Sequence, residues 1–450
     1  MGTAAGPEAT GTGAGAVPPR PAPGRRSTRK GGGGGAWDSP GFRRLLVAET
    51  VSQTGSQVSV LALPLIAIVA LGAGPVAVGV LAAAATAPVL LAGLPAGAWI
   101  DRHRRRPVLV VCDVGRAVVM ASVPVAWALG ALTLAQLYVV AFACGVLTVW
   151  ADIAAQAFLP SLVGRHRLAG ANASLEVARS AAQVAGPGLC GGLVAVAGAP
   201  LAVAADALSF GFSAVCVARV GGTEERPGSS PPGARGWAAA DIANGLRYVA
   251  AHPLLRPIAA CSAVSNLGSA MVGTVLVLFM VQTLHLGAAA IGAVLAVGNV
   301  GLVVGAMVAA RLAHRYGVGR VIVWSLGLGT PFALLVPLAP RSMAVPALLV
   351  AQLAAGLRGP VYNVNQISLR QAITPTELLG RMTATMRVLV LSTMPLGSLL
   401  GGAIASVFGL RPALVVGALV GCVACLFTLL SPVRGLLSIP PAPADPPDSR

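Results

Sequence analysis

Long apolar segments recur along most of this chain, and they constrain its fold more than any other feature of the sequence. Runs rich in Val, Leu, Ala and Gly, such as 76–100, 108–129 and 132–150, alternate with short segments that carry arginines. Each run is close to the ~20 residues that a helix needs to cross a hydrocarbon core of about 30 Å. Because backbone amides in lipid must be hydrogen-bonded within the segment, and the runs lack the alternation of a membrane barrel, we predict transmembrane helices.

The composition and the placement of charge support a membrane protein. Hydrophobic residues make up 56% of the chain and charged residues 10%, whereas soluble domains carry roughly 25% charged residues. The net charge of +17 could indicate nucleic acid as a partner, but most arginines lie in alternate loops, as the positive-inside rule predicts for cytoplasmic loops. We therefore expect a multi-pass protein of the plasma membrane, surrounded by lipid, with both termini cytoplasmic and no nucleic-acid partner.

Three polar segments rich in Pro, Gly and Arg divide the chain. We expect a disordered basic cytoplasmic tail over 1–41, a cytoplasmic linker over 222–254 and a second cytoplasmic tail over 433–450. The remaining residues, about 355, accommodate twelve spans of ~30 residues including their loops. We predict one six-helix bundle over 42–221 and another over 255–432.

An internal repeat supports this division. The segment "VSQTGS" at 51–56 returns as "VSNLGS" at 264–269, a shift of 213, and further on a shift of 210 aligns Gly191-Gly192 with Gly401-Gly402. Two parallel six-helix repeats place a binding site near the middle of the membrane, between the halves. The predicted fold is an all-α membrane protein with twelve transmembrane helices in two pseudo-symmetric six-helix bundles.

The stretch "GAWIDRHRRRPVL", residues 97–109, gathers charges between two apolar runs. Its arginines fit a topological anchor at the inner membrane surface. That interpretation leaves three charges unexplained: Asp101, and Asp113 and Arg116, which lie roughly 9 to 14 Å along the next predicted helix. Charges at such depth are costly unless they are paired or hydrated. Part of a moving gate is therefore an alternative to a topological anchor alone.

This stretch resembles the loop 2–3 signature of the major facilitator superfamily, G-x-x-x-D-R/K-x-G-R-R/K. The departure is Arg104, which stands where the signature has glycine, and "CDVGRA" at 112–117 resembles the extension of the signature into helix 3. The resemblance implies a motif that latches the cytoplasmic helix ends in the outward-facing state. Its residues here are Gly97, Asp101, Arg102, Arg105, Arg106, Asp113 and Arg116.

A second motif narrows the resemblance. "GPGLCGG" at 186–192 is similar to the antiporter signature G-P-x-x-G-G, on the positions Gly186, Pro187, Gly191 and Gly192. With "DALSF" at 206–210 and "PTELLGRMTATMR" at 375–387, it resembles the siderophore-exporter and macrolide-efflux branch of drug/proton antiporters. This resemblance implies a monomeric exporter that exchanges a small-molecule substrate for protons by alternating access. Packing between helices is the alternative explanation of the glycines and the proline.

Polar residues inside the predicted spans are the candidates for substrate and proton sites. Arg358 is the sharpest of them, because it lies near the middle of the run 343–371 and needs a cavity or a counter-charge. A proton-coupled exporter also needs a carboxylate whose proton affinity changes as the cavity opens, and we consider Glu49, Asp152 and Glu176. The full set of candidates is Glu49, Gln53, Asp152, Glu176, Arg179, Asn266, Arg358 and Tyr362.

Other functions find little support. Lys30 is the single lysine and no phosphate-binding loop is present, so we expect no ATP; no metal-ligand cluster or nucleophile–base arrangement stands out, so we expect no enzyme, metal or cofactor. An importer or facilitator of the same fold remains an alternative, as does a membrane receptor or scaffold whose basic segment 20–30 recruits a partner. The substrate stays open among siderophores, macrolides and polyketides, with an anionic compound expected if Arg358 faces the cavity.

Overall fold

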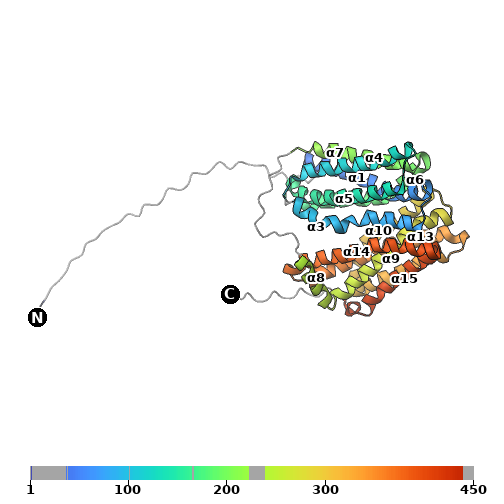
Figure 1. Ribbon diagram of the computed structural model, residues 1–450. Helices are drawn as coiled ribbons and strands as arrows, with labels where there is room; N and C mark the ends of the chain where they lie inside the picture. Colours follow the sequence, from blue (N-terminus) through green and yellow to red (C-terminus); the bar gives the residue numbers. More distant parts are fainter. Residues whose placement is uncertain are drawn as a thin grey trace. The chain divides into compact units, whose positions relative to one another are not determined.

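The computed structural model describes residues 39–438 except 101, 165–166 and 222–238, together with residues 2 and 37; for 93–98, 239–244, 341 and 376–377 it describes the backbone alone. These residues form helices joined by short loops and contain no β-strand (Figure 1). The α-helices are α1 (Pro40–Leu65), α2 (Pro75–Thr86), α3 (Pro88–Ile100), α4 (Arg105–Ala128), α5 (Leu134–Val163), α6 (Leu168–Ala197), α7 (Ala199–Ala218), α8 (Ala239–Ala251), α9 (Leu255–Leu278), α10 (Ala288–Tyr316), α11 (Val318–Gly329), α12 (Leu335–Leu338), α13 (Ala344–Ile373), α14 (Thr376–Phe408) and α15 (Leu410–Leu429).

Within the described residues, twelve helices are long and apolar enough to cross a membrane, which confirms the predicted number. Two spans are built from consecutive pieces. The second span contains α2 and continues into α3, which begins at Pro88, a residue without a backbone N–H. The ninth joins α11 to α12 through the short 3₁₀ helix η5 (Thr330–Leu334).

The predicted duplication appears in the local structure of the two halves. α1 ends in the π-helical turn η2 (Ile66–Ala70) and α9 ends in η4 (Phe279–Thr283), so the two turns are 213 residues apart. After them, the N–H of Ala73 bonds to the carbonyl of Ala67 at 2.8 Å, and the N–H of Leu286 to that of Met280 at 2.9 Å. The shift of 213 therefore carries over to individual hydrogen bonds.

Later in each half the structural shift is 211. Gly198 separates α6 from α7 and Gly409 separates α14 from α15, each with a positive φ that glycine adopts without strain. This shift pairs Gly191 with Gly402, one residue away from the pairing that the sequence alignment with a shift of 210 predicted. The helix ends thus correct the alignment of the last two spans.

The two halves meet through α6 on α10 and through α14 on α2, and both contacts depend on small residues. A Cβ at Gly191 would lie 2.7 Å from the carbonyl oxygen of Ala288, and one at Gly402 would lie 2.6 Å from that of Pro75. Ala288 and Pro75 are themselves related by the shift of 213. The two contacts are therefore equivalent under the repeat, as expected for pseudo-symmetric halves.

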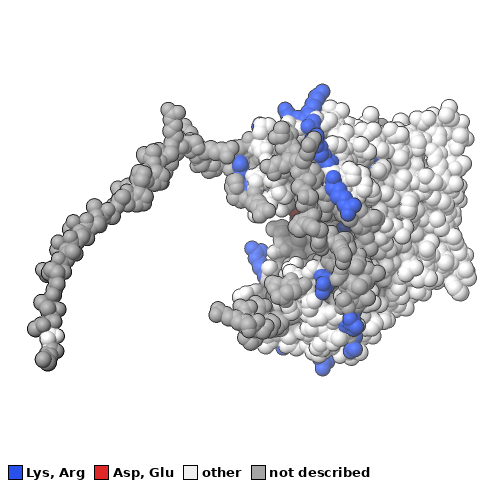
Figure 2. All heavy atoms as spheres, turned by 60° about the vertical axis from the view of Figure 1, so that its left-hand side comes forward, with Lys and Arg blue, Asp and Glu red and all other residues white. Residues whose placement is uncertain are grey.

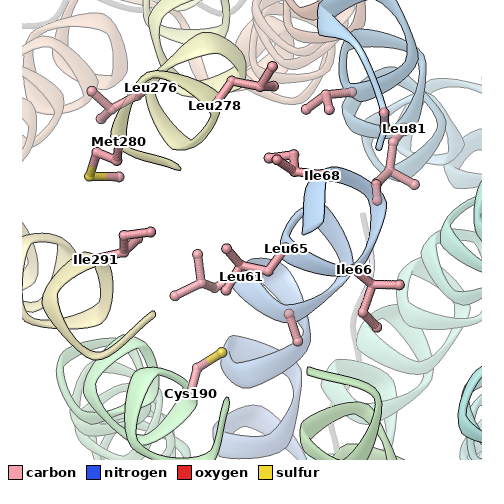
Figure 3. Packing of buried hydrophobic residues seen from close by; sticks show 14 of the residues in the cluster. Leu61, Leu65, Ile66, Ile68, Leu81, Cys190, Leu276, Leu278, Met280 and Ile291 are labelled. Atoms are coloured by element: carbon pink, nitrogen blue, oxygen red, sulfur yellow. The ribbon is translucent and has the colours of Figure 1, made fainter. Parts of the chain in front are cut away.

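A buried apolar cluster joins the halves at the same end of the molecule. It includes residues around the two π-helical turns and at the start of α10, with Ile291 pointing toward Leu61 and Leu65 in Figure 3. Several members, among them Ile66, Met280 and Ile291, are fully buried. This cluster, here called the apolar seal and defined by Leu61, Leu65, Ile66, Leu278, Met280 and Ile291, closes one end of the space between the halves.

Most of the arginines outside the cavity lie at the opposite end. Figure 2 shows Arg side chains gathered toward this face. Within the predicted linker, α8 lies against α14, where Gly245 packs on Thr385. The helix α8 was not part of the sequence prediction for the segment 222–254. The domain boundaries themselves remain predictions.

Candidate functional site

A large cavity of about 1770 Å³ lies between the two halves and is lined by spans from both. Its wall is mostly apolar, with Val, Leu and Ala side chains from α1, α2, α9 and α14. Ligand sites are commonly pockets of about 300–1,000 Å³ with a predominantly apolar wall and a few polar groups. The cavity is therefore roomy enough for a drug-sized molecule.

The charged side chains on the wall are distributed unequally. Carboxylates reach the cavity from the first half, as Asp152 and Asp206. In the second half, residues 255–432 contain one carboxylate, Glu377 at the start of α14, while Arg358 and Arg387 line the cavity. The first-half wall also carries two arginines, Arg116 and Arg179.

Asp113 and Arg116 form a buried ion pair on α4, as their depth in the membrane requires. Nη2 of Arg116 donates to one oxygen of Asp113, and the hydroxyl of Ser213 on α7 donates to the other at 2.7 Å. The guanidinium lies 4.3 Å from the ring centroid of Phe210. This network ties α4 to α7 within the first half.

The remaining gate residues lie at the start of α4 and before it. Arg102 is exposed in the turn between α3 and α4, where its N–H bonds to the carbonyl of Trp99. Arg106 donates to the carbonyl of Ala218 at the end of α7, while Arg105 begins α4. Gly97 belongs to α3. Asp101 lies outside the described residues.

The polar candidates of the first half divide between the cavity wall and the surface. Glu49 pairs with Arg179 at 3.4 Å and accepts from the amide of Gln53 at 2.8 Å. Arg179, Gln53 and Asp152 line the cavity. Glu176 is exposed and is not among the residues of the cavity wall.

In the second half, Arg358 lines the cavity and donates to the hydroxyl of Ser269 at 3.3 Å. The other two candidates, Tyr362 and Asn266, form hydrogen bonds with Ser262 of α9. The hydroxyl oxygens of Tyr362 and Ser262 are 2.8 Å apart, and the amide of Asn266 donates to the carbonyl of Ser262 at 3.0 Å. Neither Tyr362 nor Asn266 is among the residues of the cavity wall.

The antiporter-like motif lies on α6 where it faces α1 and α10. A Cβ at Gly186 would overlap Cβ of Gln57, and Gly191 packs on Ala288, as described above. Pro187 lines the cavity. Among the described residues, no neighbouring atom lies within 4 Å of the position that a Cβ would take at Gly192, so this glycine has no packing role of that kind.

Sequence reasoning missed two of the charged groups on the wall and one buried hydroxyl. Asp206 belongs to "DALSF", and its depth in the run 199–218 was the signal that it is a membrane-embedded charge. Arg387 likewise ends a longer motif, "PTELLGRMTATMR". Thr330 carries no such signal, because hydroxyls are common in spans. Among the described residues, no three His, Cys, Asp or Glu side chains gather as a metal site would require.

Comparison with known proteins now identifies the family. Residues 37–446 match the transmembrane secretion effector family. The chain belongs to this family of the major facilitator superfamily. It is 28% identical over 419 residues to the multidrug efflux pump Tap of Mycobacterium tuberculosis, covering 90% of this chain and 96% of the relative. The Tap pump of Mycolicibacterium fortuitum is 28% identical over 377 residues, covering 82% and 90%.

Solved structures share the fold. The nucleoside transporter NupG superimposes with a TM-score of 0.69 at 10% identity, covering 87% of this chain and 98% of that one. A bacterial homolog of the human lysosomal transporter Spinster, inward-facing and unoccupied, gives a TM-score of 0.69 at 14% identity, covering 88% and 97%. This secretion effector family member is thus a multi-pass membrane transporter of the major facilitator type, which is not an enzyme class.

Proposed function

We propose that this transporter exports amphipathic small molecules from the cytoplasm across the plasma membrane in exchange for protons. The observation that carries the proposal is the cavity between the halves, which is lined by both, mostly apolar, and closed at one end by the apolar seal. Similarity to multidrug efflux pumps supports export as the direction. Both termini, the linker and the arginine-rich face are placed on the cytoplasmic side, following the positive-inside rule.

The way the halves meet supports alternating access. Short-range contacts between the halves are found at Gly191 and Gly402 and in the apolar seal, all at one end of the molecule. Rocking the halves about these contacts would open the seal and close the arginine-rich end, as in transporters built from repeated bundles. The predicted gate, with Asp101 and the pair Asp113–Arg116, would then hold the cytoplasmic ends together. The chain acts as a monomer in this proposal, since each cavity is complete within one copy.

The substrate includes an anionic group, which binds to Arg358. Among the described residues, the guanidinium donates to Ser269, and a Cβ at the adjacent Gly329 would lie 2.8 Å from Cβ of Arg358. The next residue, Thr330, is buried, lines the cavity, and has no hydrogen-bond partner for its hydroxyl within the described part of the chain. Arg358 and these two hydroxyls supply donors for a carboxylate, hydroxamate or enolate. Siderophores and acidic polyketides carry such groups.

Export is tested in everted membrane vesicles that contain the protein. An exported amphipathic dye accumulates in vesicles whose interior has been acidified, and an uncoupler that collapses the pH gradient abolishes the accumulation. Accumulation that an uncoupler leaves unchanged refutes proton coupling. Movement of the dye out of the everted vesicles favours an importer. If no compound of a broad panel is transported at any gradient, the receptor or scaffold is favoured.

The substrate class is tested with Arg358→Gln on two dyes of similar size, one with a carboxylate and one with a quaternary amine. Charge-assisted hydrogen bonds contribute about 1.5–3 kcal/mol, so transport of the anionic dye at low concentration falls by roughly 10- to 100-fold. The cationic dye is transported at least as well as by the wild type. Equal loss for both dyes contradicts recognition of an anionic group by Arg358.

A further inference from the structure

Asp206 is the most deeply buried carboxylate on the cavity wall. It lies in the middle of α7, its side chain is part of a residue that is 1% exposed, and it nevertheless borders the cavity. A buried charge without a partner is costly in a low-dielectric surrounding. The site therefore has to bind a cation or hold the carboxyl group in its neutral form for part of the time.

The hydrogen-bond partners of Asp206 are neutral hydroxyls. The hydroxyl of Ser59 on α1 lies 2.5 Å from Oδ2. The hydroxyl of Ser209 lies 3.1 Å from Oδ1 and 2.8 Å from the backbone carbonyl oxygen of Asp206, so it is shared between the two. A serine hydroxyl can donate to an ionised carboxylate and can also accept from a protonated one. The two hydroxyls thus satisfy both protonation states without rearrangement of the backbone.

The other carboxylates of the first half that the structure describes differ from Asp206 in their partners or in their exposure. Asp113 pairs with Arg116 and Glu49 pairs with Arg179, and an arginine, which has donors and no acceptor, suits only the ionised form. Asp152 also borders the cavity, and the charges around it include those of Glu49 and of Arg179. Glu176 is exposed. Among the carboxylates whose side chains the structure describes, Asp206 is the one bonded to two serine hydroxyls, which fit both the charged and the neutral state.

Asp206 also lies where the cavity meets its closed end. Val203, Ala207 and Phe210, which flank it on α7, belong to the same buried cluster as the apolar seal, and so do Val58 and Leu61, which flank Ser59 on α1. Opening the seal would change the solvent access of Asp206 from one side of the membrane to the other. Such a change is what proton exchange during alternating access requires.

Arg116 connects this site to the gate. Asp206, Phe210 and Ser213 follow one face of α7, and Arg116 lies over the middle residue while it is bonded to Asp113 next to Ser213. Along a helix, four residues, or about 6 Å, separate Asp206 from Phe210. Of the ionisable groups on the elements packed around Asp206, Arg116 comes from α4 and Cys144 from α5, while α1 presents Ser59.

We infer that Asp206 is the proton-binding carboxylate of the transport cycle, and that its charge acts on the gate through Arg116. This inference rests on the proposed proton-coupled export. When the seal is open, a proton from water on the far side adds to a carboxylate oxygen of Asp206 and forms an O–H bond. When the arginine-rich end is open, that bond breaks and the proton returns to water on the cytoplasmic side. While Asp206 is ionised, it competes with Asp113 for Arg116.

The test measures conformation without a substrate, so that it can fail separately from the export assay. Spin labels are attached at Ala169→Cys on α6 and His314→Cys on α10, two exposed positions at the arginine-rich ends of these helices. Label-to-label distances are recorded in lipid nanodiscs between about pH 5 and pH 9, with the unsubstituted chain as the labelling control. The wild-type distance distribution shifts with pH, whereas Asp206→Asn keeps the low-pH distribution throughout, because the amide is uncharged like the protonated acid.

Two further variants define the result. Glu176→Gln removes an exposed carboxylate of the same half and titrates like the wild type. Ser59→Ala keeps the carboxylate but removes one donor to its ionised form, and the midpoint of the transition moves upward by about one pH unit. A wild-type distribution that does not change with pH, or Asp206→Asn that titrates like the wild type, overturns the assignment. If Asp206→Asn does not fold, an unchanged midpoint for Ser59→Ala overturns it.

Asp206→Asn also separates proton coupling from transport of the dye. In vesicles, Asp206→Asn loses accumulation driven by the pH gradient and keeps exchange of labelled for unlabelled dye across the membrane without a gradient. A wild type that shows neither activity refutes the proposed export and leaves the conformational titration as the test of Asp206.

Discussion

The two halves share one skeleton but differ in the chemistry of equivalent positions. In the first half, Gly55 on α1 packs against Asp206 and Ser209 of α7; in the second, Gly268 on α9 packs against the backbone of Gly417 and Gly421 on α15. The shift of 213 relates the first two glycines, and the shift of 211 relates Asp206 to Gly417. At equivalent positions of this helix contact, the first half therefore has the carboxylate of Asp206, whereas the second half has Gly417, which has no side chain.

This difference indicates a division of roles. The repeat supplies what has to be symmetric, namely the contacts about which two bundles can rock and the cavity between them. The carboxylates of the described spans stand in the first half, while the wall of the second half carries Arg358 and Arg387. A proton and an anionic group of the substrate would thus be bound on opposite walls, each free of direct competition from the other.

The largest effect on stability is expected from a substitution that breaks the glycine contact in the second half. In Gly268→Ala the new Cβ would lie 2.7 Å from the carbonyl oxygen of Gly417 and 2.8 Å from the nitrogen of Gly421. Both are backbone atoms, so α9 and α15 have to separate, and we expect a cost of about 3 kcal/mol. The measurement is thermal unfolding in detergent, with Gly273→Ala on the same helix as the control, because nothing lies within 4 Å of its Cβ position.

The equivalent change in the first half is expected to behave differently. In Gly55→Ala the new Cβ would approach Oγ of Ser209 and Oδ1 of Asp206, which are side-chain atoms that can rotate away. The protein should unfold at a higher temperature than Gly268→Ala but lose the pH response of the gate, since the carboxylate is displaced. Gly211→Ala on α7, also without a neighbour within 4 Å, is its control. Equal destabilisation by both alanines would contradict the distinction between the two contacts.

A smaller effect tests the symmetry of the closed end. In Gly191→Ala and Gly402→Ala the added methyl groups would meet the carbonyl oxygens of Ala288 and Pro75 at nearly the same distance. Each variant should favour opening of the apolar seal by about 1.4 kcal/mol, a tenfold shift of the conformational equilibrium, visible as shorter label distances at the arginine-rich end. Gly192→Ala should leave the distances unchanged. If one alanine shifts the equilibrium and the other does not, the two contacts do not act as equivalent hinges.

The fold was predictable to a greater extent than the site. Apolar runs of span length follow directly from the absence of water in the membrane, and the repeat was visible because "VSQTGS" and "VSNLGS" keep one offset. The predicted depth of Asp113 and Arg116 in the membrane indicated that their charges need partners, and the two residues form an ion pair with each other. Which of the polar candidates face the cavity could not be predicted, because the rotation of a helix about its axis depends on packing. Tyr362 faces the packing around α9, and Asp206 faces the cavity.

The smallest effect on stability is expected at the N-terminal end of the first membrane span of each half. Ser39 precedes α1, where its hydroxyl accepts from the N–H of Phe42 at 3.3 Å; 213 residues later, Nδ1 of His252 accepts from the N–H groups of Leu254 and Leu255 at 3.2 and 3.4 Å. Both side chains accept from backbone N–H groups at the start of the first span of their half, Ser39 as the N-cap and His252 from two residues before the N-cap. Only the imidazole can lose its acceptor by protonation. Partial burial lowers the pKa of His252 below its usual value.

Because the folded state binds this proton less readily than the unfolded state, the capping contribution is complete above about pH 6.5 and declines as the pH falls below it. A cap of this kind contributes about 1 kcal/mol, which in a protein of this size shifts the unfolding temperature by about 2 °C or less. His252→Ser should keep the cap and remove this part of the pH dependence, whereas Ser39→Ala should lower the unfolding temperature equally at pH 5.5 and pH 7.5. If His252→Ser retains the full pH dependence of the wild type, the imidazole is not the titrating cap, and the helix starts of the two halves differ in composition without differing in behaviour.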